Sequence, residues 1–294
     1  MKISAKTQVL GLLGNPLGHS LSPLMHNAVF AAMGSDCVYL PFQVSPDRLA
    51  GALEGIRSFN LKGANVTIPF KEAVIPHLDD LSPIAADCGA VNVIKNDNGR
   101  LIGYNTDGPG FIAALREEAV KAEGSRVLFI GAGGAARSLA AVLRQERVSH
   151  IDFLDNDYER ARSLAALIGA NGNCSARGAL MNEARFREIS AGADIIINCS
   201  PVGMFPNIDQ TPVSKLDAVD ARTVLCDIIY NPLQTQLLKM GQAIGLKTIN
   251  GLAMFVNQGA LTLEILLGIS PDREYMKSIL EEHLGEGSWQ YRGT

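Results

Sequence analysis

The chain has 294 residues, of which 47% are hydrophobic and 19% are charged. This is roughly the length of two domains, and the apolar content is enough for packed cores, which excludes a disordered chain. A formal net charge of −4, from 26 basic and 30 acidic side chains, provides no broad cationic surface for nucleic acid and favours an enzyme or binding protein for small molecules.

The sequence shows no secretory or membrane signal. Residues 1–10 are mixed polar, and no apolar run approaches the roughly 18 residues that a membrane span needs. The five cysteines are scattered and form no C-x-x-C pair, so neither structural zinc nor a disulfide framework is expected. We therefore expect unreacted thiols, no bound metal, no membrane or nucleic-acid partner, and a cytoplasmic location.

Short apolar runs alternate with helical stretches along the first third of the chain. The expected strands are residues 9–13, 38–44 and 63–68, and the expected helices are residues 23–33 and 47–59. Ser22 is the residue type of an N-cap for the first helix, and Pro23 suits its first position. This alternation predicts a mainly parallel sheet covered by helices.

The same alternation is clearer in the rest of the chain. The expected strands are residues 126–130, 151–154, 194–198, 224–228 and 247–249, and the expected helices are residues 134–145, 158–168 and 252–268. A Gly-Pro-Gly run beginning at Gly108 indicates a domain boundary. We predict an α/β protein with domains at residues 1–108 and 109–250, and C-terminal helices at residues 251–294.

A glycine-rich turn follows the strand expected at residues 126–130. The sequence Gly-Ala-Gly-Gly-Ala-Ala from Gly131 matches G-x-G-x-x-G/A and opens the next helix, whose N-terminal N–H groups suit a pyrophosphate. Gly131 permits the tight turn, Gly133 lets the backbone approach the ligand, and Ala136 keeps helix and strand close. We predict dinucleotide binding, with an ordinary strand-to-helix turn as the alternative. The expected contacts in this turn are Gly131, Ala132, Gly133, Gly134 and Ala135.

Asp155 lies 21 residues after Gly134, at the end of the second strand of this unit. A carboxylate there can accept hydrogen bonds from ribose hydroxyls, whereas a 2′-phosphate would meet like charge. Residues 154–157 contain no arginine or lysine to bind such a phosphate. We therefore predict NAD as the preferred cofactor over NADP. An acidic turn that caps the next helix through Asp157 is a compatible alternative.

Further polar segments lie at the expected ends of strands or in turns, where ligands of open α/β sheets collect. Each alone is compatible with ordinary turn chemistry. Together and in order, they resemble the shikimate dehydrogenase family, which includes the quinate/shikimate dehydrogenases. The matching motifs are H-S-x-S-P at 19–23, N-V-T-x-P-x-K at 65–71, G-A-V-N at 89–92, G-Y-N-T-D-G at 103–108, P-x-G-M at 201–204, Y-N-P at 230–232 and G-L-x-M-x-x-x-Q-G at 251–259.

The resemblance implies a substrate-binding N-terminal domain, a Rossmann-type cofactor domain, and a C-terminal helix that returns to the first. It assigns Ser20 and Ser22 to the shikimate carboxylate, with Tyr230 nearby. The residues that it places around the ring hydroxyls are Thr67, Lys71, Asn92, Asp107 and Gln258. The residues that it places near the nicotinamide are Met204, Gly251 and Met254, although methionines also serve as core fillers. NADP-preferring members commonly carry Asn-Arg-Thr where this chain has Asp-Asn-Asp from Asp155.

Lys71 and Asp107 are the expected catalytic pair. When hydride reaches the carbonyl carbon of 3-dehydroshikimate, a proton must reach its oxygen, and a lysine ammonium can stabilise the alkoxide and donate that proton. Asp107 would orient the ammonium and bind an adjacent hydroxyl. In the oxidative direction Lys71 must accept the proton, which a neighbouring carboxylate opposes. The alternative is a structural salt bridge, worth only about 0–1 kcal/mol if exposed.

The resemblance implies reversible NAD(P)-dependent interconversion of shikimate and 3-dehydroshikimate in aromatic amino-acid (chorismate) biosynthesis. One alternative is quinate dehydrogenation in quinate catabolism by the same site. Another is a non-catalytic dinucleotide sensor, but sensing requires neither Lys71 nor Asp107. A homodimer is a further possible assembly.

Overall fold

The computed structural model describes residues 3–170, 172 and 174–285, which form two compact units. The first unit comprises the residues up to Thr106 and those from Val256 onward, and the second comprises Asp107–Phe255. These divisions lie two and five residues from the boundaries predicted at 108 and 250. The C-terminal segment from Val256 onward belongs to the first unit.

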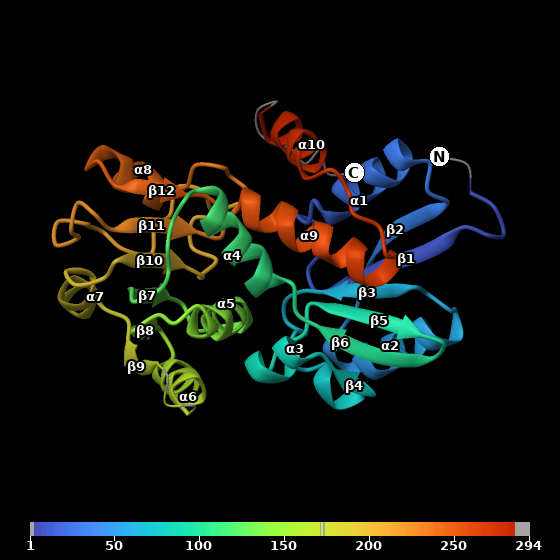
Figure 1. The fold of residues 1–294 in the computed structure, drawn as a ribbon, viewed down its shortest axis with the longest axis horizontal. Helices are drawn as coiled ribbons and strands as arrows, with labels where there is room; N and C mark the ends of the chain where they lie inside the picture. The colour runs from blue at the N-terminus through green and yellow to red at the C-terminus, as the bar shows by residue number, and fades with distance from the viewer. Residues whose placement is uncertain (1–2, 171, 173, 286–294) are drawn as a thin grey trace. The chain divides into compact units, whose positions relative to one another are not determined.

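The first unit is built on a six-stranded mixed sheet with the order β2-β1-β3-β5-β6-β4 (Figure 1). Strands β1 (Gln8–Gly14), β2 (Cys37–Gln43) and β3 (Gly63–Val66) are parallel. Strands β5 (Val93–Asp97) and β6 (Arg100–Tyr104) form an antiparallel hairpin, and β4 (Asp80–Leu81) lies beside β6. The sequence interpretation found the parallel half of this sheet and missed the hairpin.

In the described residues of this unit, five α-helical segments and two short 3-10 turns accompany the sheet. They are α1 (Ser22–Met33), α2 (Leu49–Ser58), α3 (Pro83–Cys88), the later part of α9 (Leu252–Leu267), α10 (Arg273–Gly285), and the turns Pro46–Arg48 and Ile75–His77. Helix α2 has the spacing of an amphipathic helix, because Leu49, Leu53 and Ile56 are buried on one face. Those three side chains lie in the same hydrophobic core as Phe70 and Leu101. This shared core packs α2 against the sheet.

The predicted N-cap of α1 is wrong by one residue. The helix begins at Ser22 itself, and its N-cap position is Leu21, which makes no side-chain cap. Instead, the Ser20 hydroxyl accepts a hydrogen bond from the Ser22 N–H at 3.3 Å. Ser20 therefore lies in the turn before the helix and Ser22 is its first residue, and neither hydroxyl caps the helix from the N-cap position.

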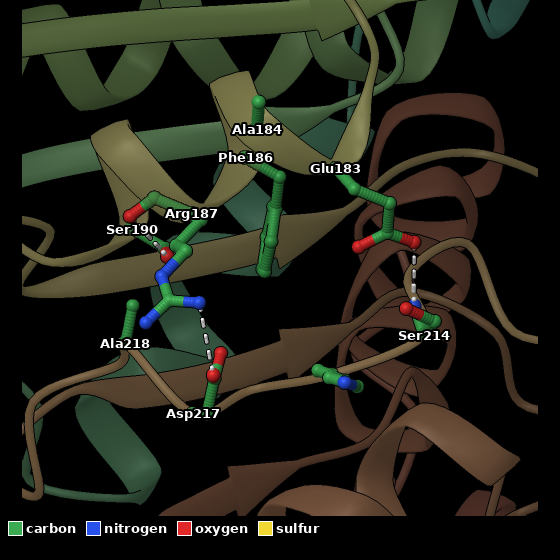
Figure 2. A pocket seen from close by; sticks show the side chains of 9 residues that line it. Glu183, Ala184, Phe186, Arg187, Ser190, Ser214, Asp217 and Ala218 are labelled. Atoms are coloured by element: carbon green, nitrogen blue, oxygen red, sulfur yellow. Dashed lines mark hydrogen bonds and ion pairs between the residues drawn. The ribbon is translucent and has the colours of Figure 1, made fainter.

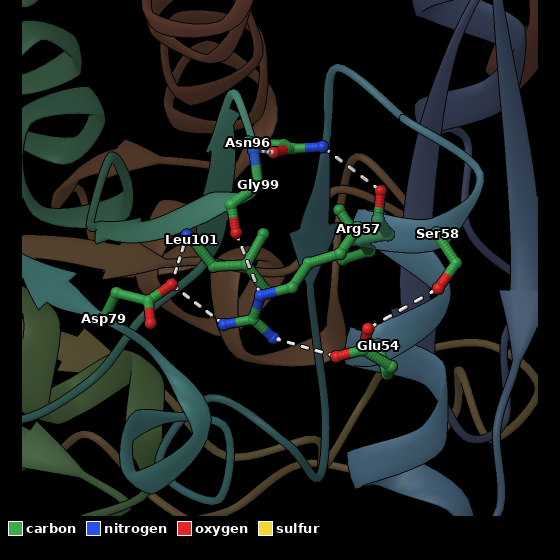
Figure 3. Close-up of polar contacts among 8 residues, drawn as sticks. Glu54, Arg57, Ser58, Asp79, Asn96, Gly99 and Leu101 are labelled. Atoms are coloured by element: carbon green, nitrogen blue, oxygen red, sulfur yellow. Dashed lines mark hydrogen bonds and ion pairs between the residues drawn. The ribbon is translucent and has the colours of Figure 1, made fainter.

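Arg57, at the end of α2, fixes the hairpin (Figure 3). Its Nε donates to the Gly99 carbonyl at 3.0 Å, and its Nη2 lies 2.8 Å from Asp79 Oδ2. The same carboxylate accepts the Leu101 N–H, and these two contacts lower the pKa of Asp79. Asn92, a predicted site residue, immediately precedes this hairpin.

The second unit contains a six-stranded sheet in which every strand is parallel to its neighbours (Figure 1). The strands are β7 (Arg126–Ile130), β8 (His150–Asp155), β9 (Ser175–Leu180), β10 (Ile195–Asn198), β11 (Val224–Asp227) and β12 (Lys247–Ile249). Their order, β12-β11-β10-β7-β8-β9, is the doubly wound arrangement of a dinucleotide-binding domain. The order reverses between β7 and β10, and ligands of such sheets bind at the carboxyl ends of the strands at that point.

Helices join the consecutive strands of this sheet except β10 and β11, which are joined by a segment without a helix. The connecting helices are α5 (Gly134–Gln145), α6 (Tyr158–Gly169), α7 (Glu183–Ser190) and α8 (Gln236–Ala243), while α4 (Asp107–Glu117) precedes β7 and the start of α9 follows β12. The central strands are continuous apolar runs such as 195–197, as expected for a sheet buried on both faces. Among the helices that the structure describes, none is long and apolar enough to cross a membrane.

Candidate functional site

The glycine-rich turn has the geometry that its sequence predicts. Gly131 has φ +97°, a conformation that residues with a side chain rarely adopt, and an added Cβ would lie 3.0 Å from the Ser200 nitrogen. Its N–H donates to the Leu154 carbonyl at 2.7 Å, which ties the end of β7 to the end of β8. Gly133 precedes α5, and an added Cβ there would meet no atom within 4 Å. The turn is therefore tight at Gly131 and open at the helix N-terminus.

Asp155 is the predicted ribose-binding residue, and it also holds the glycine-rich turn. Its side chain is almost buried, and its Oδ2 accepts the Ala132 N–H at 2.7 Å. Its Oδ1 accepts the Asp157 N–H at 2.8 Å. The carboxylate thus fixes the glycine turn to the end of β8, where the adenosine half of a dinucleotide binds in this fold.

A cation that the sequence interpretation did not consider lies beside this carboxylate. Arg160, in the first turn of α6, has its Nη1 3.9 Å from Asp155 Oδ2 and its Nη2 3.5 Å from Asp157 Oδ2. Asp157 caps α6 through the Arg160 N–H, and this hydrogen bond lowers the pKa of Asp157. The segment therefore presents two carboxylates and one guanidinium.

Further predicted cofactor and substrate residues of the second unit follow three strands: Met204 after β10, Tyr230 after β11, and Gly251 and Met254 after β12. Met204 is 39% exposed, whereas Met254 is almost buried at the start of α9. An added Cβ at Gly251 would collide with the Ile228 carbonyl, so only glycine fits where α9 begins. The Tyr230 ring stacks on Phe255 with centroids 4.1 Å apart. Phe255 thus orients a predicted substrate residue, and the sequence interpretation did not single it out.

A buried carboxylate ends β11. Asp227 is 1% exposed and accepts hydrogen bonds from the Thr235 hydroxyl, the Ile229 N–H and the Asn198 amide, at 2.8, 3.1 and 3.0 Å. Burial raises the pKa of Asp227 to about 6, although the three hydrogen bonds oppose this shift. Sequence periodicity gives no sign of this group, since an aspartate at the end of a strand resembles any turn residue.

In the first unit, a buried hydrogen-bond network adjoins the predicted carboxylate-binding serines. Tyr39 is fully buried, its hydroxyl donates to Asn65 Oδ1 at 2.7 Å, and it also shares a hydrogen bond with Ser22. Burial raises the pKa of Tyr39, and the hydrogen bond with Ser22 opposes the shift. The Asn65 amide donates to the Thr262 hydroxyl at 3.1 Å, and that hydroxyl donates to the Gln258 carbonyl at 2.9 Å. The network joins the start of α1 to α9.

Asn92 is buried and clamps Thr106. Its amide nitrogen donates to the Thr106 hydroxyl at 2.9 Å, and its oxygen accepts the Thr106 N–H at 2.8 Å. This double contact fixes Thr106, the residue that precedes Asp107. Asp107 is almost buried and is the first residue of α4. The structure therefore gives Asn92 a positioning role in addition to the substrate contact that was predicted.

Thr67 and Lys71 lie in the segment that follows β3. Thr67 donates its N–H to the Leu13 carbonyl at 2.9 Å, and the Lys71 carbonyl accepts the Val91 N–H at 2.8 Å. Both side chains are partly buried. Lys71 belongs to the first unit and Asp107 to the second, so the catalytic pairing of these two residues stays a prediction.

A cavity of about 370 Å³ in the second unit contains none of the predicted site residues (Figure 2). It lies between α7 and residues 214–218. Two of its charged groups form an ion pair, since Arg187 lies 3.2 Å from Asp217, and Glu183 accepts the Ser214 N–H at 2.9 Å. We assign it no ligand. Within the described part of the chain, no cluster of His, Cys, Asp or Glu could hold a metal ion.

Comparison with known proteins places this architecture in a family. Residues 12–94 match the shikimate dehydrogenase substrate binding domain, and residues 251–281 match the shikimate 5'-dehydrogenase C-terminal domain. A shikimate dehydrogenase (NADP(+)) of Syntrophomonas wolfei is 56% identical over 97% of this chain and 98% of its own length. The chain belongs to the shikimate dehydrogenase family.

Solved structures of shikimate dehydrogenases share the whole fold. The enzyme of Listeria monocytogenes, in complex with shikimate and NAD, is 35% identical with a TM-score of 0.88, covering 95% of this chain and 98% of its own. A shikimate dehydrogenase in complex with NADP+ is 39% identical with the same TM-score, covering 96% and 98%. The quinate dehydrogenase of Corynebacterium glutamicum, in complex with NAD, is 31% identical with a TM-score of 0.85, covering 94% and 99%.

Proposed function

We propose that this protein catalyses reversible hydride transfer between a nicotinamide dinucleotide and the shikimate/3-dehydroshikimate pair, as a step of aromatic amino-acid biosynthesis. The observation that carries the proposal is a tight glycine turn at the reversal point of an all-parallel sheet, in a chain 56% identical to a shikimate dehydrogenase. The proposed substrate domain is residues 1–108 and the proposed dinucleotide domain is residues 109–250. The C-terminal helices proposed at 251–294 complete the first domain, and residues 286–294 of this range lie outside the described part of the chain.

The proposed substrate contacts divide by chemistry. Hydroxyl donors at Ser20 and Ser22 suit the carboxylate, with Tyr230 beside them. The groups assigned to the ring hydroxyls are Thr67, Lys71, Asn92, Asp107 and Gln258. A compact polyhydroxy acid needs several donors and acceptors that converge from separate segments, and the buried networks around Ser22 and Asn92 hold such groups in fixed orientations.

Lys71 is the proposed proton donor and acceptor. The bound nicotinamide supplies hydride in the reductive direction and accepts it in the oxidative direction. During reduction, the Lys71 ammonium stabilises negative charge on the carbonyl oxygen and transfers a proton to it. During oxidation, the same nitrogen accepts the hydroxyl proton. Asp107 orients Lys71 and binds a neighbouring hydroxyl.

We further propose NAD as the preferred cofactor. The adenosine end of the site carries the carboxylates of Asp155 and Asp157 against the single guanidinium of Arg160, so a 2′-phosphate meets a net negative segment. The relative from Syntrophomonas wolfei is named for NADP(+), the cofactor opposite to the one that we propose. Comparing kcat/KM for NAD and NADP therefore tests the proposed preference directly. A kcat/KM higher for NADP than for NAD would overturn the preference and leave the dehydrogenase proposal intact.

One assay tests the proposed reaction against its alternatives. Absorbance at 340 nm is followed with shikimate or quinate, each with NAD or NADP. We expect turnover with shikimate at a higher kcat/KM than with quinate. Faster turnover of quinate would instead favour a quinate dehydrogenase, and cofactor binding without turnover of either acid would favour a dinucleotide sensor. The predicted homodimer is tested separately by sedimentation velocity.

A further inference from the structure

Two loops of the second unit converge on one buried carboxylate at the carboxyl ends of β10 and β11. The first loop, residues 199–205, contains Met204, and the second, residues 228–232, contains Tyr230. Asp227 binds the second loop directly through the Ile229 N–H. It binds the first loop through Asn198, whose amide oxygen accepts both the Ser200 N–H at 3.0 Å and the Ser200 hydroxyl at 2.7 Å.

Both loops have further attachments to predicted cofactor positions. The Phe205 N–H donates to the Asn231 carbonyl at 3.0 Å, which joins the two loops to each other. The Gly251 N–H donates to the Ile229 carbonyl at 3.0 Å, which joins the second loop to the start of α9. The first loop also lies against the glycine turn, because an added Cβ at Gly131 would approach the Ser200 nitrogen. The loop that contains the proposed nicotinamide contact Met204 and the loop that contains the proposed substrate contact Tyr230 are thus held by the same hydrogen-bond network around Asp227.

We propose that Asp227, acting through Asn198, Ser200 and Thr235, is a positioning residue that holds the nicotinamide half of the cofactor site in register with Tyr230. It touches neither ligand. A charged acceptor suits this task because its two oxygens hold three donors from different segments at once, and hydrogen bonds to a carboxylate are stronger than those between neutral groups. This positioning role rests on the proposed function, because that function identifies the nicotinamide and the substrate as the ligands of the two loops.

The part of the site proposed to bind the adenosine half of the cofactor does not depend on Asp227, since the glycine turn is held by Asp155. Loss of the Asp227 network should therefore weaken nicotinamide binding and hydride transfer, while a ligand that lacks nicotinamide still binds. The variants are Asp227→Ala, Asp227→Asn and the milder Ser200→Ala, which removes one hydroxyl and leaves the carboxylate in place.

Thr235→Val and Thr223→Val are compared as two losses of a buried threonine hydroxyl. Thr223 immediately precedes β11, whereas Thr235 is the N-cap residue of α8 and its hydroxyl also accepts the Leu238 N–H. Both threonines are 1% exposed, and each donates its hydroxyl to one buried acceptor, Asp227 Oδ2 for Thr235 and the Ala193 carbonyl for Thr223. A general loss of packing would affect both variants alike. Only Thr235→Val should alter the nicotinamide site.

The test measures dissociation constants for reduced dinucleotide and for ADP-ribose, which lacks nicotinamide, by calorimetry, together with kcat. We expect Asp227→Ala to lower kcat at least tenfold and to reduce the affinity advantage of reduced dinucleotide over ADP-ribose at least threefold. Ser200→Ala and Thr235→Val should shift both quantities in the same direction. Asp227→Asn keeps one accepting oxygen for Asn198 and Ile229 and loses the acceptor of the Thr235 hydroxyl, so it should change both quantities less than Asp227→Ala does. Thr223→Val should stay within twofold of the wild type.

An unchanged affinity advantage of the dinucleotide over ADP-ribose would overturn the inference, whether both affinities stay at the wild-type value or fall by the same factor. This result is read in Asp227→Ala, or in Ser200→Ala and Thr235→Val if Asp227→Ala does not fold. The proposed function fails separately, through absence of wild-type turnover with shikimate, and the binding comparison still decides the positioning role in that case.

Discussion

The buried imidazole of His26 makes a specific prediction about the pH dependence of stability. His26 is 1% exposed, and its ring lies against that of Tyr39 with centroids 4.5 Å apart and a tilt of 33°. Among the residues that the structure describes, neither ring nitrogen has a hydrogen-bond partner. Burial therefore lowers the pKa of His26 from 6.5 to about 3. The native state keeps this ring neutral under conditions in which the unfolded chain binds a proton.

The sign and size of the effect on the free energy of unfolding follow from the difference between the His26 pKa values of the native and unfolded states. Because the unfolded state binds more protons, His26 reduces stability as the pH falls below 6.5, and the loss continues until the pH reaches about 3. Between pH 7 and pH 5 the expected loss is about 2 kcal/mol. His26→Leu replaces the imidazole with an apolar side chain of similar size, so the variant should lack this contribution.

Urea unfolding at pH 7 and pH 5, followed by circular dichroism, measures the effect. The wild type should lose about 2 kcal/mol more than His26→Leu between the two pH values. Carboxylate titrations are common to both proteins and cancel in the comparison. His77→Leu, at an exposed histidine, is the matched control and should retain the wild-type pH dependence. Equal pH dependence in His26→Leu and the wild type would refute the reasoning.

Three further predictions follow from the site. Gly131→Ala should cost about 1–3 kcal/mol in thermal unfolding and raise KM for the dinucleotide, because φ is +97° and Ser200 is close; an unchanged KM would contradict this. Asn92→Ala should cost about 1–3 kcal/mol, since it leaves the Thr106 N–H without its acceptor, and unfolding at wild-type urea concentration would count against that role. Asp157→Asn should raise kcat/KM for NADP relative to NAD by about fivefold, measured at low salt, because one charge near the 2′ position is removed; a constant ratio would exclude Asp157 from cofactor selection.

Much of the secondary structure of the second unit could be predicted from the sequence, because the patterns that indicate its strands and its glycine turn are local in the chain. Apolar runs mark strands that are covered on both faces, and the turn from Gly131 combines glycine with the required position between strand and helix. Arg160 was missed for a simple reason. The charge argument stopped at Asp157, whereas the first helical turn brings residues three positions apart onto one side.

The hairpin of the first unit had a signal that the sequence interpretation did not use. Asn98 and Gly99 both have positive φ, at 53° and 91°, and Asn-Gly is the preferred pair for a tight hairpin turn. The strands on either side are short and only partly alternating, so their apolar pattern is weak. Turn chemistry, rather than periodicity, specifies this antiparallel part of the sheet.

The buried polar networks could not be predicted because they join residues that are distant in the chain. Asn65 contacts Thr262 across 197 positions, and Asn198 contacts Asp227 across 29. Residue type alone does not distinguish such groups from solvated turn residues. The motifs identified candidate ligand contacts, whereas the structure identifies the residues that orient them.

The central claim is that Lys71 carries out proton transfer, and its most direct test is kcat of Lys71→Ala at saturating shikimate and cofactor. The account predicts a fall of about 10²- to 10⁴-fold, the range for loss of a positioned acid or base. Lys62→Ala, at an exposed lysine of the same unit, should stay within twofold of the wild type. A folded Lys71→Ala enzyme with wild-type kcat would contradict the account.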